Sequence, residues 1–95
     1  MIVVSNASPL IILAKIGQLH LLKLLYDSVV VHAEVHAEAV VPGMQLPGST
    51  QIAEATWLDV RQLSNPEALS VAHAQFSLAR SELATILLAE ELRPT

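Results

Sequence analysis

The chain has 95 residues, of which 53% are hydrophobic and 15% are charged. This length suits one small domain, and a composition so rich in apolar residues excludes intrinsic disorder. The chain has no cysteine, which excludes a disulfide framework and any cysteine-ligated metal site. The net charge of −4 argues against a protein that holds nucleic acid through an overall positive field.

The apolar stretches are too short and too interrupted to cross a membrane. The richest one, residues 10–25, contains Lys15, His20 and Lys23. A spanning helix needs about 18 or more apolar residues in a row. Met1 is followed at once by apolar residues, whereas a secretory signal begins with a basic region. We therefore expect a soluble, cytoplasmic protein.

The first half of the chain alternates short β-branched runs with helical segments. Unbroken apolar runs suit strands that are buried on both faces, as in a parallel sheet. Ser8 as a cap, Pro9 at the first helical position and Gly17 as a stop frame one helix. The predicted strands cover residues 2–4 and 28–31, and the predicted helices cover 10–16, 19–26 and 33–41. This order predicts an α/β fold with right-handed crossovers and a parallel sheet covered by helices.

The second half of the chain begins with a predicted loop over residues 42–49, which holds two Pro-Gly dipeptides. The last helix has the clearest pattern, with Ser81 as its predicted cap and apolar residues on one face. The predicted strand covers residues 57–60, and the predicted helices cover 51–56, 67–76 and 81–92.

Three polar residues follow a predicted strand or lie near the start of a predicted helix: Asn6, Glu38 and Glu82. Ligands of open parallel sheets bind at the carboxyl ends of the strands. Carboxylates that meet at such an edge suit Mg²⁺ or Mn²⁺, which activates water and stabilises the transition state of phosphodiester cleavage. A simpler interpretation stays open for Glu82, because a glutamate near a helix N-terminus commonly only complements the helix dipole.

Three segments carry a family resemblance. The chain opens with Ile-Val-Val-Ser-Asn-Ala-Ser-Pro-Leu-Ile over residues 2–11. Residues 29–38 read Val-Val-Val-His-Ala-Glu-Val-His-Ala-Glu, and residues 78–89 read Leu-Ala-Arg-Ser-Glu-Leu-Ala-Thr-Ile-Leu-Leu-Ala. In order and spacing these segments resemble PIN-domain proteins, most closely the predicted nucleic-acid-binding branch related to toxins of toxin–antitoxin pairs. His32 stands where the family tends to have Pro, and Ser81 where it has Gly.

The resemblance implies a Rossmann-like PIN fold with an acidic pocket that binds Mg²⁺ or Mn²⁺. It implies an endoribonuclease that acts on single-stranded or structured RNA, is commonly a dimer and is often silenced by an antitoxin protein. Glu38 and Glu82 carry over as catalytic residues and metal ligands. Asn6 carries over as a metal ligand at a position where active members often have Asp. An amide oxygen brings no charge, so we expect the cation to be held more weakly.

The resemblance also implies a single partial domain over residues 1–95, apparently truncated at the C-terminus. The family continues with a further parallel strand that ends in one or two Asp residues, whereas this sequence ends at Thr95. We therefore expect weak or no nuclease activity from this chain. The alternative is a non-catalytic remnant that binds a partner protein or dimerises, because missing strands would leave a sheet edge open.

The other polar residues near the predicted site each allow two interpretations. His32 and His36 would share a helix face and suit zinc, or His32 lies at the turn between strand and helix. Glu34 shares the predicted face of Glu38, where it adds negative charge to the pocket or is simply solvated. Arg80 meets RNA phosphate or lies on the surface.

Overall fold

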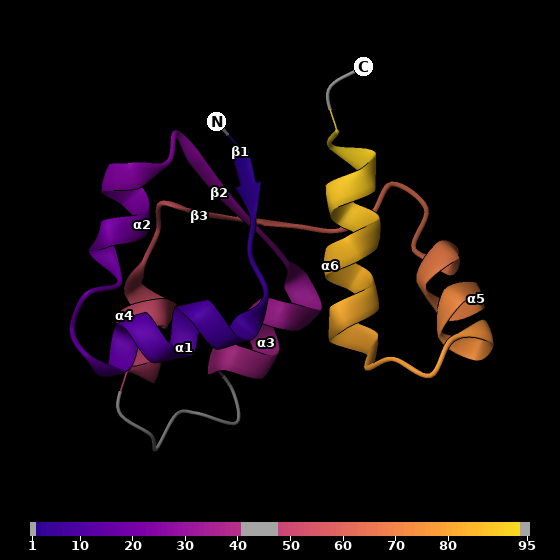
Figure 1. The fold of residues 1–95 in the computed structure, drawn as a ribbon, viewed down its shortest axis with the longest axis horizontal. Coiled ribbons are helices and arrows are strands. Elements are labelled where there is room, and N and C mark those ends of the chain that lie inside the picture. Colours follow the sequence, from indigo (N-terminus) through magenta and orange to yellow (C-terminus); the bar gives the residue numbers. More distant parts are fainter. Residues whose placement is uncertain (1, 41–47, 94–95) are drawn as a thin grey trace.

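The fold is built on three parallel strands, and the computed structural model describes residues 2–40 and 48–93. The strands are β1 (Ile2–Val4), β2 (Ser28–His32) and β3 (Leu58–Arg61), in the spatial order β1-β2-β3 (Figure 1). In register, Val3 lies opposite Val29 and Val30 lies opposite Asp59. The predicted α/β fold with a parallel, helix-covered sheet is thereby confirmed.

Six helices are described, with two between β1 and β2, two between β2 and β3, and two after β3. They are α1 (Ala7–Lys15), α2 (His20–Leu25), α3 (Ala33–Val40), α4 (Ser49–Glu54), α5 (Glu67–Gln75) and α6 (Arg80–Glu91). Figure 1 shows α6 standing beside the sheet, with α5 on its outer side. Within the described ranges, no helix combines the length and apolar character that crossing a bilayer requires.

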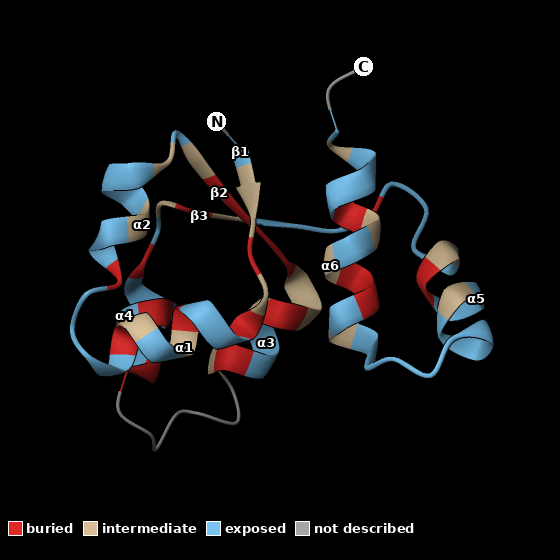
Figure 2. Cartoon of the chain, in the orientation of Figure 1, coloured by how far each residue is buried: buried red, intermediate tan, exposed pale blue. Residues whose placement is uncertain are grey.

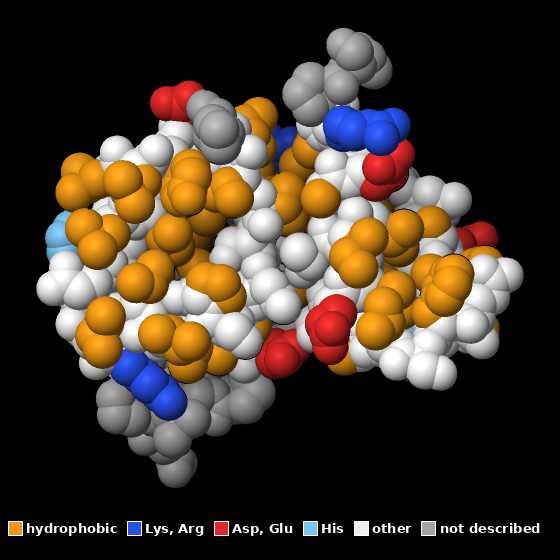
Figure 3. Space-filling view, in the orientation of Figure 1, with side chains coloured by type: hydrophobic (Ala, Val, Ile, Leu, Met, Phe, Trp, Pro, Cys, Tyr) orange, Lys and Arg blue, Asp and Glu red, His pale blue; other side chains and the backbone are white. Residues whose placement is uncertain are grey.

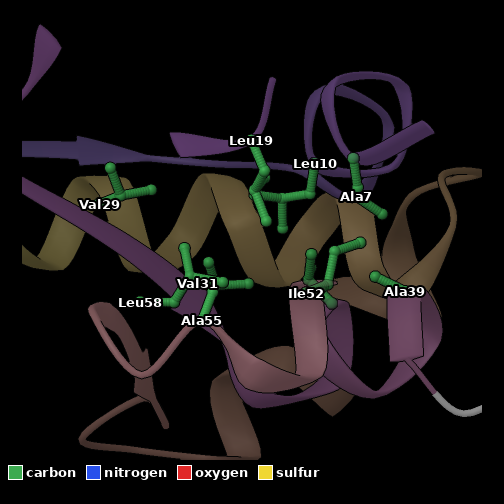
Figure 4. Packing of buried hydrophobic residues seen from close by; sticks show 11 residues of the cluster. Ala7, Leu10, Leu19, Val29, Val31, Ala39, Ile52, Ala55 and Leu58 are labelled. Carbon is green, nitrogen blue, oxygen red and sulfur yellow. The ribbon is translucent and has the colours of Figure 1, made fainter. Parts of the chain in front are cut away.

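The sheet buries apolar side chains on both faces, because successive residues of a strand point to opposite sides. Val29 and Val31 join one core cluster with residues of α1, α3 and α4, whereas Val30 joins a second cluster with residues of α5 and α6. Figure 4 shows members of the first cluster converging, and Figure 2 shows buried residues along β2 and on the helix faces toward the sheet. The same alternation places His32 on the side of the second cluster.

The start of α1 differs from the prediction. The helix begins at Ala7, and Asn6 is its cap, with extended backbone and an Oδ1 that accepts the Ala7 N–H at 2.8 Å. Ser8 lies inside the first turn, so its prediction as the cap was wrong. Pro9 is the third residue of the helix rather than the predicted first; it is tolerated there because the N–H groups of the first turn have no partner within the helix. The stop at Gly17 is confirmed by its left-handed φ of +70°.

The start of α6 also differs from the prediction. The helix begins at Arg80, its cap is Ala79, and no side chain is hydrogen-bonded to the cap position. Ser81 therefore lies within the helix, where its carbonyl oxygen accepts the Thr85 hydroxyl at 3.0 Å. Its prediction as the cap was wrong, because the helix starts one residue earlier than the hydroxyl pattern suggested.

Most other element boundaries shift by one or two residues. Strand β2 continues to His32, and β3 begins and ends one residue later than predicted. Helix α4 begins at Ser49, directly after Gly48, whose φ of +96° turns the chain into the helix. Residue 41 of the predicted third helix and residues 42–47 of the predicted loop lie outside the described residues.

Candidate functional site

The carboxyl ends of the parallel strands lie along one edge of the sheet, and β1 is followed there by Ser5, which is buried, and by Asn6. The Asn6 side chain is half-buried and is held by the hydrogen bond that caps α1. An amide oxygen has two lone pairs, so the cap leaves one acceptor site of Oδ1 free. Asn6 is therefore fixed in place, yet is still able to contact a ligand.

Glu38 and Glu82 lie on two helices that pack against each other. Glu38 is in the second turn of α3, Glu82 is in the first turn of α6, and both are exposed. The described contacts join α3 with α6, α1 with α3, and α6 with β1. Figure 3 shows acidic side chains over α3 and over the start of α6 close together on one face. The three predicted site residues thus belong to a group of adjoining elements.

The described residues do not form a closed metal site. No group of three His, Asp or Glu side chains among them is arranged to hold a metal ion. Mg²⁺ is commonly bound by only one or two carboxylates and keeps several waters. Glu38 and Glu82 are both exposed, which suits a water-rich mode better than a protein cage. The assignment of these residues as metal ligands stays a prediction.

A different set of polar side chains meets at the end of β2. Glu34 Oε1 lies 2.7 Å from Arg80 Nε, and His32 Nδ1 accepts the backbone N–H of Glu34 at 3.0 Å. The His32 ring is only 2% exposed, and burial lowers the pKa of this histidine. The nearby Glu34 carboxylate opposes that shift, and the Arg80 guanidinium adds to it. His32, Glu34 and Arg80 therefore form one polar cluster.

Sequence reasoning did not find this cluster, because Arg80 follows Glu34 by 46 residues and no local pattern joins them. The one available signal was strand alternation, which puts His32 on the side of the sheet that α6 covers. His32 does lie at the turn between strand and helix, as one interpretation held. It ends a strand while His36 is in a helix, so the two do not share a helix face as the zinc interpretation required.

Positive charge is scarce on this protein. The chain has only five Lys and Arg residues. Each of the three arginines is paired with a carboxylate: Arg61 with Asp59, Arg80 with Glu34, and Arg93 with Glu90. Lys15 and Lys23 lie exposed on α1 and α2. The described residues thus offer no continuous basic track for an RNA backbone.

The outer side of β1 is open and apolar. Among the described residues β1 pairs only with β2, and a cavity of about 370 Å³ lies beside it. Its lining comprises Val3, Val4, Ser5, Asn6, Pro9, Leu22, Tyr26 and Thr85. Large apolar side chains of β1 and α2 are also exposed, including Ile2 at 59% and Leu25 at 70%. Figure 3 shows apolar side chains spread over this face.

Comparison with known proteins gives one family. A search of curated proteins and a search of solved structures found no match. The DUF3368 family model, described as a PIN domain, matches residues 2–95, which is nearly the whole chain. The match agrees with the parallel sheet flanked by helices and with the order of the three segments identified in the sequence. The chain therefore belongs to the PIN-domain family, whose members are in general nucleases that use divalent metals.

Proposed function

We propose that this protein is a weak, metal-dependent endoribonuclease of the kind found as the toxin of toxin–antitoxin pairs. The observation that carries the proposal is the packing of α3 against α6, because it brings together the two helices that bear Glu38 and Glu82. Membership of the PIN-domain family supports a nuclease. RNA is the proposed substrate, and an antitoxin-like protein is the proposed regulator.

Each residue of the candidate site has a proposed role. Glu38 and Glu82 hold Mg²⁺ or Mn²⁺ through their carboxylates, and Asn6 offers its amide oxygen to the same site. The metal, when bound, supplies Lewis acidity and lowers the pKa of a coordinated water. Two carboxylates and a neutral amide bring less negative charge than a fully acidic site, so metal affinity is low. Because a carboxylate beside each arginine offsets its positive charge, binding of the RNA backbone is also weak.

The test is cleavage of a labelled single-stranded RNA in the presence of Mn²⁺ or Mg²⁺. The wild-type chain is compared with Glu38→Gln, Glu82→Gln and, as a matched control, Glu54→Gln. Glu54 is an exposed glutamate in α4, outside the candidate site. We expect slow cleavage that stops with EDTA and persists in the control. Activity that survives both site substitutions would show that the ligands are assigned wrongly.

A second candidate function is favoured by the open side of β1. A strand with one unpaired edge and an adjacent apolar cavity is a template for another strand or an apolar segment. On this account the chain is a non-catalytic binding module that pairs with an antitoxin-like protein or with a second copy of itself. Size-exclusion chromatography with light scattering tests it. A stable monomer over a wide concentration range would count against self-association.

A further inference from the structure

A second polar site lies between the end of β2 and the layer formed by α5 and α6. A cavity of about 200 Å³ opens there, and its polar lining consists of His32, Glu34, Gln62 and Arg80. Its apolar wall includes Leu63 and Pro66. Pockets for drug-sized ligands measure roughly 300–1,000 Å³, so this cavity accepts one small group. It lies at the carboxyl edge of the sheet, where α/β folds bind ligands.

His32 supplies the cavity with a hydrogen-bond donor. Its Nδ1 accepts a backbone N–H, so the neutral ring carries its proton on Nε2. No described residue is hydrogen-bonded to Nε2. The residue is 2% exposed and lines the cavity. The Nε2 proton is therefore available to a ligand that brings an acceptor.

Glu34 supplies an acceptor that lacks a donor. Its Oε1 is engaged by Arg80, whereas Oε2 is buried and receives no hydrogen bond from any described residue. A buried acceptor without a donor is unfavourable, because it has lost its hydrogen bonds to water. The side chain as a whole is 39% exposed, so the carboxylate has room to turn Oε2 into the cavity. A ligand with an N–H donor would remove this cost.

Arg80 adds further donors on the same side. Its Nε donates to Glu34, and no other described residue is hydrogen-bonded to the terminal nitrogens of the planar guanidinium, so these can donate to another acceptor. The site thus sets donors from His32 and Arg80 beside an acceptor from Glu34. A bare phosphate would meet the donors but would also face the Glu34 carboxylate, so a phosphate alone does not fit the full set.

We propose that this cavity binds one unpaired guanine base of single-stranded RNA. Guanine places its acceptors O6 and N7 beside its donors N1–H and N2–H, which matches the donors of Arg80 and His32 beside the Glu34 carboxylate. Leu63 and Pro66 provide an apolar wall for the face of the ring. The inference deepens the proposed function, since it takes RNA as the source of the base.

The other bases fit less well. Adenine turns the N1 acceptor toward the carboxylate, and uracil flanks its single N–H with two carbonyl acceptors. Cytosine offers one amino donor beside its N3 acceptor, so it can satisfy Glu34 but has no pair of adjacent donors. A site that hydrogen-bonds a specific edge discriminates strongly, because the wrong base leaves buried polar groups unpaired.

The test is an NMR titration of the full chain with GMP, AMP, CMP and UMP in the presence of EDTA. We expect GMP to shift the amide signals of Glu34 and Leu63 and to bind at least about tenfold more tightly than UMP, which corresponds to about 1.4 kcal/mol. Glu34→Gln should weaken GMP binding at least tenfold, and Glu54→Gln, in the unrelated helix α4, should leave it unchanged. Arg80→Lys, which keeps the charge but loses the planar fork, should also weaken it.

Three results would overturn the proposal. These are equal affinity for all four nucleotides, displacement of GMP by inorganic phosphate, and no saturable binding in the millimolar range. Circular dichroism establishes whether each variant is folded. If Glu34→Gln does not fold, GMP binding by Arg80→Lys tests the proposal instead. The titration contains no divalent metal. Absence of GMP binding would therefore say nothing about the proposed metal-dependent cleavage, and absence of cleavage would not affect the binding result.

Discussion

Gly48 shows how a single residue fixes a junction between elements. Its φ of +96° is a conformation that suits glycine, and a Cβ built there would lie 2.9 Å from the backbone carbon of Ala14. Gly17 also has a positive φ, +70°, but a Cβ there would meet nothing within 4 Å. A side chain at either glycine would strain the backbone, but only a side chain at Gly48 would also overlap neighbouring atoms.

Gly48→Ala is expected to destabilise the protein more than Gly17→Ala. The left-handed conformation alone costs about 1–2 kcal/mol for a residue with a Cβ, and only Gly48 adds the overlap with α1. Denaturant unfolding of both variants measures the difference. Equal losses would mean that α1 moves away from Gly48 at no cost, contrary to the close packing described.

His32 is expected to make the stability of the fold depend on pH. Burial keeps its folded-state pKa below the ordinary value of 6.5, so the unfolded chain binds a proton more readily. The free energy of unfolding should therefore be highest above about pH 6.5 and should fall as the pH drops through the folded-state pKa. The groups that face the ring are the Glu34 carboxylate and the Arg80 guanidinium.

His32→Asn tests this dependence, since the asparagine oxygen can take the place of Nδ1 as the acceptor of the Glu34 N–H. Unfolding free energies measured between pH 7.5 and 5.5 should show a shallower slope in this variant than in the wild type. His73→Asn, at an exposed position of α5, is the control and should keep the wild-type slope. An unchanged slope in His32→Asn would contradict the role of this histidine.

At the scale of elements, β1 pairs with β2 along one edge, and no other described strand pairs with its second edge. The Ser5 N–H donates to the Val30 carbonyl oxygen at 2.9 Å. Because N–H groups alternate along a strand, the Val3 N–H also faces β2, whereas the Val4 N–H faces the open edge. Proline is tolerated in an edge strand where its missing N–H would face outward.

Val4→Pro is therefore expected to block strand pairing at the open edge while it keeps the pairing of β1 with β2. If the wild-type chain self-associates through this edge, light scattering should show the variant shifted toward monomer. Val3→Pro, which removes a donor to β2, should instead unfold or strongly destabilise the protein. Self-association that is unchanged in a folded Val4→Pro variant would place the contact elsewhere.

The elements themselves were largely predictable from sequence, and the reasons are local. Runs such as Val29-Val30-Val31 have the β-branched, all-apolar character of a buried strand, and the structure places them there. Helix starts were less predictable, because Ser8 and Ser81 each resemble a cap while Asn6 and Ala79 occupy the cap positions. At α1 two cap residues two positions apart compete, whereas the alanine that caps α6 carries no cap signal at all.

At the scale of the whole molecule, the candidate site depends on how elements pack. Glu38 and Glu82 were identified from their places in two segments, but the packing of α3 on α6 that brings their helices together is a tertiary feature. The ion pair of Glu34 with Arg80 is another tertiary feature, and the residue pattern of neither helix predicts it. Sequence therefore predicted the candidate residues of the acidic site and not the polar cluster beside it.

Substitutions of Glu38 and Glu82 should lower the rate of RNA cleavage to the extent that they lower metal affinity. Removing one of the two carboxylates is expected to reduce both metal affinity and cleavage by at least about tenfold, a loss that even residues supporting metal ligands produce. Raising the Mn²⁺ concentration should partly restore cleavage in Glu82→Gln. Restored cleavage at high Mn²⁺ would show that the variant is folded and has lost only metal affinity. A cleavage rate that does not depend on Mn²⁺ would contradict a metal role for Glu82.

The most direct test of the account locates the metal itself. Mn²⁺ is paramagnetic and broadens the NMR signals of nearby amides, so a titration of the labelled chain maps where the ion binds. The account predicts broadening centred on Asn6, Glu38 and Glu82 that disappears in the Glu38→Gln/Glu82→Gln double variant and persists in Glu54→Gln. Broadening centred on other carboxylates, or none at all, would contradict the assignment of this face as the metal site.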